Sequence, residues 1–262
     1  MPLNLVQRCL GLFGFELVPR HALPVEATEA DRRTVARVRP YTMTSAARLW
    51  ALIQSARYIV QAGIPGDLVE CGVWRGGSAM AMAMTLLDCG DADRTIWLYD
   101  TFSGMTPPGA FDVEAGSGRS ARDTLQRTRK VKGNNVWCIA SLDEVRANLQ
   151  TTGYPASNFR IVAGDVAETL PHYAPDRIGL LRLDTDWYES TAAELAQLYP
   201  RLSPGGVCMI DDYGYWRGAR RAVDDYFTSH GVHVLLHKID ETGRIFVKPG
   251  YFGAKERDPR LI

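Results

Sequence analysis

The sequence has no excess of charge of either sign. Its 262 residues include 30 lysines and arginines and 30 aspartates and glutamates, so the formal net charge is zero at neutral pH. No block of like charges forms a tail that would bind nucleic acid or an anionic membrane surface. We therefore expect a small-molecule partner, with no nucleic acid and no membrane.

Long hydrophobic runs are also missing, since no stretch reaches the roughly 20 apolar residues of a membrane-spanning helix. Segment 9–18 resembles the core of a signal peptide, but Arg8 is the only cation before it and no small-residue cleavage site follows. We interpret this segment as an amphipathic element. The five cysteines are odd in number and scattered, which favours reduced thiols over disulfides and a cytoplasmic location.

The glycine turn near residue 72 lacks the two common phosphate-binding patterns. The stretch "DLVECGVWRGGSAMAMAM", which starts at Asp67, reads as a strand, a turn with three glycines and a helix of small residues. The turn matches neither G-x-G-x-x-G nor the Walker A pattern, and no lysine follows the glycines to hold a phosphate. Dinucleotide and nucleoside triphosphate ligands are therefore disfavoured.

Strands and helices alternate along most of the chain. A helix is expected within 44–63, with Thr44 or Ser45 as its cap and Gly63 at its end. The runs "DLVEC", "TIWLYD", "FRIVAGD", "IGLLRLD" and "GVCMIDD" are each followed by a loop and a helix-like stretch. This pattern predicts an α/β fold with a doubly wound, Rossmann-like, mainly parallel sheet, and segment 232–249 predicts an antiparallel C-terminal hairpin.

Acidic residues stand at or near the ends of these five runs. They are Glu70, Asp100, Asp165, Asp184 and Asp211. Ligands of doubly wound sheets bind outside the carboxyl ends of the strands, so these acids should face one site. Any single acid could instead cap the helix that follows it, but capping explains the whole set poorly.

The first acids suggest the cofactor. Glu70, just before the glycine turn, would repel a pyrophosphate but would suit an ammonium or a sulfonium. Asp100 ends the next strand, where an acid commonly binds the ribose hydroxyls. S-adenosylmethionine combines a nucleoside with a positive charge, so it fits both acids. Asp165 would lie near the adenine edge, or else cap the helix around Ala167.

The remaining acids suggest a metal. If their strands are neighbours, about 4.8 Å apart, Asp184, Asp211 and Asp212 would cluster and need a cation to offset their repulsion. Oxygen donors favour a hard ion such as Mg²⁺, with Mn²⁺ and Ca²⁺ as alternatives. Asp186 should lie beside the metal, where it could accept a proton, or it could cap the helix at 188–199.

Two other segments have simple interpretations. Met80, Met82 and Met84 alternate with alanines along a helix, which is typical of core packing. Segment 103–122 is long and rich in glycine, proline and serine, which is typical of a lid or a binding loop.

Five motifs together, "VECGVWRGGSA", "LYDTFSGM", "GDVAETLP", "LRLDTDWYEST" and "PGGVCMIDDYG", resemble the macrocin O-methyltransferase (TylF-like) family. The resemblance covers residues 41–249. It implies a class I methyltransferase domain at 44–262 after a helical extension or lid at 1–43, and a homo-oligomer, expected to be a dimer. The roles that it implies are metal ligation by Asp184, Asp211 and Asp212, general base for Asp186, and cofactor binding by Thr44, Glu70, Gly72, Ser78, Asp100 and Asp165.

The resemblance also implies a reaction. The family transfers a methyl group from S-adenosylmethionine, with Mg²⁺, to a deoxysugar hydroxyl of a glycosylated antibiotic intermediate. The likeness is greatest to members that act on noviose in aminocoumarin biosynthesis, so its 4-hydroxyl is the expected target. Two alternatives remain from the residues alone. Asp184 and Asp186 form a D-x-D pattern that suits a metal-dependent glycosyltransferase, or the chain binds a nucleoside without catalysis.

Overall fold

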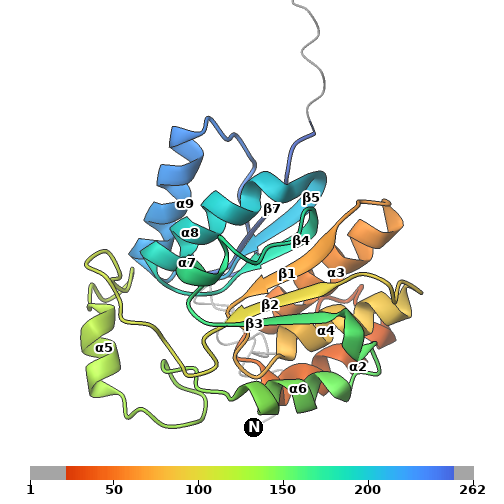
Figure 1. Ribbon diagram of the computed structural model, residues 1–262, viewed down its shortest axis with the longest axis horizontal. Helices are drawn as coiled ribbons and strands as arrows, with labels where there is room; N and C mark the ends of the chain where they lie inside the picture. The colour runs from red at the N-terminus through yellow and green to blue at the C-terminus, as the bar shows by residue number, and fades with distance from the viewer. Residues whose placement is uncertain (1–21, 251–262) are drawn as a thin grey trace, which may run out of the picture.

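The computed structural model describes residues 22–250 and has one central sheet with helices on both faces (Figure 1). The strands of this part are β1 (Asp67–Cys71), β2 (Ile96–Asp100), β3 (Phe159–Ala163), β4 (Ile178–Leu183), β5 (Leu202–Ile210), β6 (His237–Lys238) and β7 (Arg244–Val247). Their order is β3-β2-β1-β4-β5-β7-β6. Strands β1 to β5 are parallel, whereas β7 runs antiparallel to both β5 and β6. The predicted doubly wound sheet with an antiparallel C-terminal hairpin is therefore confirmed.

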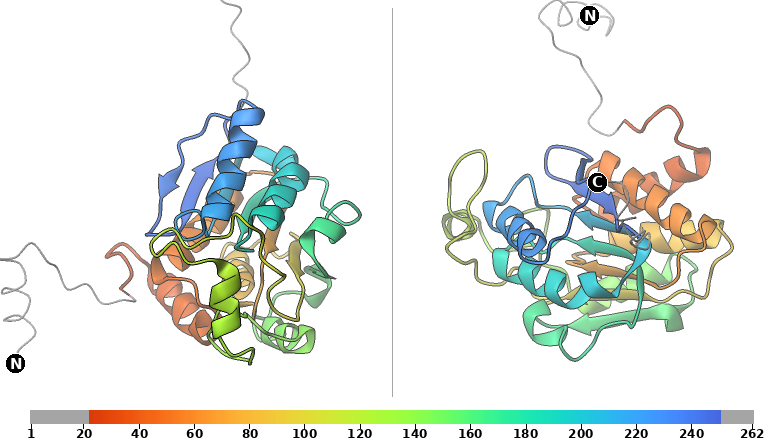
Figure 2. Two further views of the ribbon diagram at one scale, coloured as in Figure 1. Left: turned by 90° about the vertical axis from the view of Figure 1, so that its left-hand side faces the viewer. Right: turned by 90° about the horizontal axis from the view of Figure 1, so that it is seen from above.

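The helices form two layers. They are α2 (Glu29–Val38), α3 (Ala46–Gln61), α4 (Gly77–Asp88), α5 (Ala121–Arg127), α6 (Leu142–Gln150), α7 (Val166–Thr169), α8 (Tyr188–Leu198) and α9 (Arg217–Ser229), with short 3-10 turns at Arg39–Tyr41, Ala156–Asn158 and Tyr199–Arg201. Helices α2, α3, α4 and α6 cover one face of the sheet, and α7, α8 and α9 cover the other (Figures 1 and 2). Helix α5 belongs to neither layer and packs against Trp187 and Trp216. None of the helices within residues 22–250 is long and apolar enough to cross a membrane.

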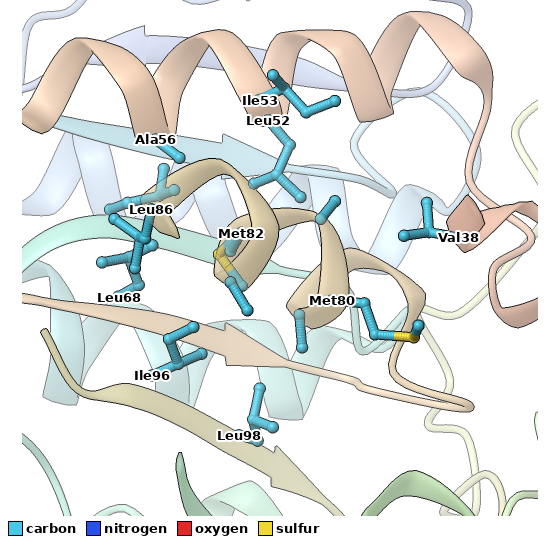
Figure 3. Close-up of a cluster of buried hydrophobic side chains, with 14 of the residues drawn as sticks. Val38, Leu52, Ile53, Ala56, Leu68, Met80, Met82, Leu86, Ile96 and Leu98 are labelled. Carbon is cyan, nitrogen blue, oxygen red and sulfur yellow. The ribbon is translucent and has the colours of Figure 1, made fainter. Parts of the chain in front are cut away.

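Each face of the sheet has its own apolar core, because successive side chains of a strand point to opposite faces. Leu68 of β1 joins the α3–α4 side, and the next residue, Val69, joins the α8–α9 side. Met80 and Met82 of α4 are fully buried on the first side, where Figure 3 shows them between α3 and the strands. The core-packing interpretation of these methionines is confirmed.

The N-terminal helices begin and end at recognisable signals. The Ser45 hydroxyl accepts the Arg48 N–H and caps α3, and Gly63 follows the helix with φ 63°. Helix α2 is tied to α3 by an ion pair between Asp31, which is 1% exposed, and Arg57 at 2.5 Å. The part of segment 1–43 that the structure describes therefore packs on the sheet domain, while the predicted amphipathic element at 9–18 lies outside the described residues.

The C-terminal hairpin is shorter than expected. Within the predicted strand 232–239, only His237 and Lys238 pair with β7. Val232, Val234 and Leu236 pack against the α8–α9 core, and the alternate side chain of Leu235 is 84% exposed. The alternation of apolar residues here reflects packing on one side rather than pairing with a neighbouring strand.

The strand order creates a crevice between β1 and β4. The chain passes from β1 to β2 and β3 on one side, then returns to β4 and β5 on the other side. The crossovers on the two sides of β1 therefore diverge, and such a switch point opens a crevice at the carboxyl ends of the strands.

Candidate active site

A pocket of about 1080 Å³, counting the part open to solvent, lies at these carboxyl ends. The lining residues that the sequence singled out are Thr44, Gly72, Ser78, Asp100, Asp165, Asp184, Asp186, Asp211 and Asp212. Glu70 lies beneath the pocket and is 1% exposed. One pocket therefore brings together all of the predicted site residues except Glu70, which it places directly below.

The two halves of the pocket meet where β1 and β4 end. The Asp184 N–H donates to the Cys71 carbonyl at 2.9 Å, so the backbones run close together. A Cβ atom at Gly72 would lie 1.8 Å from the Asp184 carbonyl oxygen, and Gly72 has φ 84°. Glycine is required at this position by both its conformation and its neighbour.

Gly72→Ala is expected to lower the free energy of unfolding by at least ~3 kcal/mol, because the methyl group adds a backbone clash to the ~1–2 kcal/mol cost of the left-handed conformation. Gly90→Ala is the matched control, since Gly90 has φ 73° and no atom within 4 Å of the added Cβ. Urea denaturation of both variants measures the difference. Equal losses would contradict the close approach of the two strands.

Asp100 holds the glycine turn. Its Oδ2 accepts the N–H groups of Val73 at 2.7 Å and Trp74 at 3.0 Å, and its Oδ1 accepts the Phe102 N–H at 2.7 Å. Burial raises the pKa of Asp100, and the three backbone hydrogen bonds oppose that rise. Asp100 therefore shapes the β1–α4 turn in addition to facing the pocket.

Asp165 caps α7 and also lines the pocket. Its Oδ1 accepts the Ala167 N–H at 2.9 Å and caps α7, as the capping interpretation predicted. The same residue lines the pocket. A cap and a ligand contact are compatible here, because one carboxylate has several acceptor positions.

A buried arginine that the sequence analysis did not single out joins the two halves. Arg182, 1% exposed near the carboxyl end of β4, contacts Glu70 at 2.5 Å, Asp211 at 2.6 Å and Asp184 at 2.7 Å. It also donates to the Thr44 hydroxyl at 2.9 Å. The available signal was the charge itself, because an arginine in a buried strand requires buried acidic partners.

A second arginine reaches the same acids. Arg48 of α3 contacts Asp211 at 2.7 Å and Asp240 at 2.9 Å, and it also lines the pocket. It links the N-terminal end of α3 to the hairpin that carries β6 and β7. Like Arg182, Arg48 could not be identified from the pattern of acidic residues at the ends of the predicted strands.

The carboxylates at the ends of β4 and β5 disfavour one another's ionisation. Burial, opposed by Arg182, raises the pKa of Asp184 to about 6. Burial and then the Asp184 charge raise the pKa of Asp186 to about 7, and burial and the Asp186 charge raise the pKa of Asp212 well above its usual value. The site thus holds more acidic groups than its two arginines neutralise.

Asp186 lies in a tight turn beside two tryptophans. Its Oδ1 accepts the indole N–H of Trp216 at 2.6 Å, and its backbone N–H donates to Asp212 at 3.2 Å. Trp216 packs edge-on against Trp187 with ring centroids 5.0 Å apart. The hydrogen bond from Trp216 therefore orients the Asp186 carboxylate within the pocket.

Asp186 does not cap α8, so that interpretation is wrong. The first N–H of the helix, at Tyr188, donates to Asp112 Oδ1 at 2.8 Å. Asp112 comes from the loop 103–122 and is 1% exposed, and its Oδ2 accepts the Gly109 N–H at 2.6 Å. The same loop lines the pocket with Gly104, Met105 and Thr106. The loop is thus joined to the turn that carries Asp186.

The three proposed metal ligands lie in one pocket, but Asp184 and Asp211 are paired with arginines. The Oδ2 atoms of Asp184 and Asp211 both face Arg182. Within residues 22–250, no three histidine, cysteine, aspartate or glutamate side chains are grouped so as to hold a metal ion. Asp211 Oδ1, however, is buried and has no hydrogen-bond partner in the part of the chain that the structure describes.

Comparison with known proteins identifies the family. The model of the macrocin O-methyltransferase (TylF) family matches residues 14–248. The chain is 38% identical over 237 residues to the 8-demethyl-8-(2,3-dimethoxy-α-L-rhamnosyl)-tetracenomycin-C 4′-O-methyltransferase of Streptomyces olivaceus, covering 89% of this chain and 86% of that protein. It is 35% identical over 203 residues to the demethyldecarbamoylnovobiocin O-methyltransferase of Streptomyces niveus, covering 78% and 74% respectively.

A solved structure agrees with this assignment. The O-methyltransferase NovP superposes with a TM-score of 0.68 at 33% sequence identity, over 80% of this chain and 83% of that chain. The predicted Rossmann-like methyltransferase fold is therefore confirmed. Sequence, fold and the position of the pocket agree that this chain belongs to the macrocin O-methyltransferase family and is an O-methyltransferase.

Proposed function

We propose that this enzyme transfers the methyl group of S-adenosylmethionine to a sugar hydroxyl of a glycosylated antibiotic intermediate, with the help of a hard divalent cation. The observation that carries the proposal is the single pocket, which unites the glycine turn and Asp100 with the acids that follow β4 and β5. A methyl donor and a sugar acceptor would meet between these two halves.

The residues around the glycine turn fit the methyl donor. Gly72 carries no side chain toward the pocket, and Asp100 stands where ribose hydroxyls are commonly bound. Glu70 lies below the turn, where Oε1 is paired with Arg182 and Oε2 has no hydrogen-bond partner among the described residues, and we assign this acid to the positively charged methionine part of the donor. Thr44 and Ser78 would contact that part, and Asp165 would lie near the adenine.

The acidic cluster fits a hard cation by its chemistry. All of the donors are oxygens, Asp211 Oδ1 lacks a hydrogen-bond partner among the described residues, and the pKa values of Asp184 and Asp212 are raised by burial and by neighbouring carboxylates. Asp184, Asp211 and Asp212 would hold the ion, preferably Mg²⁺. Bound there, it would supply positive charge that lowers the pKa of the acceptor hydroxyl.

Asp186 is assigned the role of general base. Trp216 holds its Oδ1, so Oδ2 is the atom that would accept the hydroxyl proton. The hydroxyl oxygen then forms a bond to the methyl carbon as the bond from that carbon to sulfur breaks. Holding both reactants in line contributes on the order of 7 kcal/mol or more to lowering the barrier.

The acceptor is a deoxyhexose in this proposal. One relative is named for the 4′-O position of a dimethoxyrhamnosyl group and another for demethyldecarbamoylnovobiocin. Both names support a glycosylated antibiotic, and the noviose 4-hydroxyl of an aminocoumarin is our specific candidate. The decisive assay is methyl transfer to demethyldecarbamoylnovobiocin and to the tetracenomycin compound, followed by mass spectrometry of the product.

Calorimetry tests the donor site without an acceptor. S-adenosylhomocysteine is expected to bind with a micromolar Kd, roughly 8 kcal/mol. Asp100→Ala is expected to weaken binding at least tenfold, because it removes the ribose contact and loosens the turn that Asp100 holds. Asp88→Ala, an exposed acid at the far end of α4, is the control. Unchanged affinity in Asp100→Ala would reject the assignment.

Neither alternative function is supported. Membership in an O-methyltransferase family argues against both the glycosyltransferase and the non-catalytic nucleoside-binding protein. A UDP-sugar in the same calorimeter is therefore expected to give no heat of binding. We further propose a cytoplasmic homodimer whose segment 1–43 is an extension of a catalytic domain at 44–262, with no nucleic-acid or membrane partner.

A further inference from the structure

Glu194 is a buried acidic residue to which the proposed reaction assigns no role. It lies on the inner face of α8 and is 0% exposed. Its neighbours include the buried thiols of Cys71 and Cys208. Glutamate is almost never fully buried without a compensating partner, because removing its charge from water is costly. The contacts of this side chain therefore need an explanation.

Glu194 is hydrogen-bonded to Thr185, which lies between Asp184 and Asp186. The Thr185 hydroxyl donates to Glu194 Oε1 at 2.8 Å. Glu194 Oε2 is buried and has no hydrogen-bond partner among the described residues. The carboxyl group thus sits beneath the Asp184–Thr185–Asp186 turn and holds its central side chain.

The carbonyl group of Thr185 is held as well. It accepts the Trp187 N–H at 2.8 Å and the Ser190 hydroxyl at 3.2 Å. The first of these bonds closes a three-residue turn around Asp186, whose φ is 68°. Such turns are rare and strained for a residue with a side chain, and they persist only where surrounding contacts define them.

The turn decides where two carboxylates point. Asp184 precedes Thr185 and is fixed to β1 through Cys71, and Asp186 follows it and is fixed to Trp216. Rotation of the Thr185 peptide groups would move both acids, because they flank it directly. The contact from Glu194 to Thr185 opposes that rotation.

We propose that Glu194 is a positioning residue which, through the Thr185 hydroxyl, fixes the turn and so orients Asp184 and Asp186 for methyl transfer. The inference rests on the function proposed above for these two acids. A purely structural Glu194 would contribute to stability alone and would leave turnover of the folded enzyme unchanged.

The kinetic test uses isosteric variants at both ends of the contact. Thr185→Val removes the hydroxyl at constant shape and is expected to lower kcat about tenfold or more, since small displacements of catalytic groups are costly. The KM for S-adenosylmethionine should change less than about threefold, because Asp100, the proposed contact of the donor's ribose, lies on β2 and not on the turn. Thr185→Ser and Glu194→Gln keep the hydrogen bond and should retain most of the activity. A normal kcat in Thr185→Val would overturn the proposal.

Combining the variants tests whether the two residues act together. If Glu194 acts through Thr185, then adding Glu194→Leu to Thr185→Val should lower kcat less than about twofold further. Independent effects that multiply would overturn the coupling. Should Glu194→Leu fail to fold, Glu194→Met, which also lacks a hydrogen-bond acceptor for Thr185 and keeps the length of the side chain, replaces it in the combination with Thr185→Val, with the same expected absence of a further loss.

A spectroscopic test needs neither acceptor nor cofactor. In protein labelled with 5-fluorotryptophan, Thr185→Val should shift the ¹⁹F resonances of Trp187 and Trp216, which border the turn. The resonances of Trp50 and Trp97 serve as internal controls. If no acceptor is methylated by the wild type, the proposed function fails, but the spectra still decide the positioning. Unshifted Trp187 and Trp216 resonances would overturn it.

Discussion

Methyl transfer is expected to fall to background after exhaustive treatment with EDTA and to return when Mg²⁺ is added. The reason is the surplus of crowded carboxylates at Asp184, Asp211 and Asp212, which the two arginines neutralise only in part. The rate is measured with saturating donor and acceptor, and calorimetry checks that the apoprotein still binds S-adenosylhomocysteine. Full turnover in protein shown to be metal-free would reject the metal site.

Substitution of the ligands should reproduce this loss one side chain at a time. Asp184→Asn and Asp212→Asn are each expected to lose most of the activity and to bind Mg²⁺ too weakly to detect by calorimetry. Asp143→Asn is the matched control, because its side chain is 94% exposed on α6. Circular dichroism confirms that the variants fold. Normal Mg²⁺ affinity in both variants would move the ion to other residues.

Asp186→Asn is expected to lower turnover at neutral pH by ~10²-fold or more, because an amide cannot accept the hydroxyl proton. Asparagine keeps an oxygen acceptor for Trp216 and tolerates the positive φ of 68°, so the melting temperature should change little. Steady-state kinetics and thermal denaturation measure the two quantities. A near-normal rate with donor, acceptor and metal saturating would remove the base assignment.

The pH dependence provides an independent check on the same variant. Burial and then the charge of Asp184 raise the pKa of Asp186 to about 7. The unprotonated, accepting form therefore increases as pH rises through this region, and the wild-type rate should rise with it. A cation bound at Asp184 would offset the negative charge that helps to raise the pKa of Asp186, so the increase in rate would occur at lower pH. Asp186→Asn should lack the rise and recover slowly at high pH, where solvent hydroxide accepts the proton.

The strand pattern predicted the fold and most of the pocket for one physical reason. The carboxyl ends of parallel strands meet at one edge, so acids such as Asp100 and Asp184 can be placed together once the strands are recognised. Strand β1 was predicted with its observed bounds, Asp67–Cys71. Local periodicity and the topology rule were together sufficient to predict the fold and the position of the pocket. The roles of the individual acids stay predictions.

Other parts of the site depend on partners that are distant in the sequence. Arg182 stands in a run that reads as apolar, and only the folded sheet brings Glu70 and Asp211 to it. Asp112 lies in a loop with no periodic pattern, and its partner is the backbone of Tyr188. A pattern of residue types does not specify such pairs, because they depend on how separate elements pack.

The hairpin shows a third kind of difference. Apolar residues alternate from Val232 to Leu236, as they would in a strand, but these residues pack on α9 and the neighbouring core without pairing. Alternation of apolar residues indicates that one side of a segment is buried. It does not report whether hydrogen-bonding partners exist for the backbone at the edge of a sheet.

The contact between Asp112 and α8 limits how the specificity of this enzyme can be redesigned. Loops are the usual choice for grafting between relatives, but this one carries the cap of a core helix. A Cβ atom at Gly218 would lie 2.0 Å from Asp112 Oδ1, so the receiving surface is equally restricted. A chimaera that exchanges segment 103–122 must therefore retain an aspartate at 112 opposite a glycine at 218, and its useful diversity is confined to the positions around them.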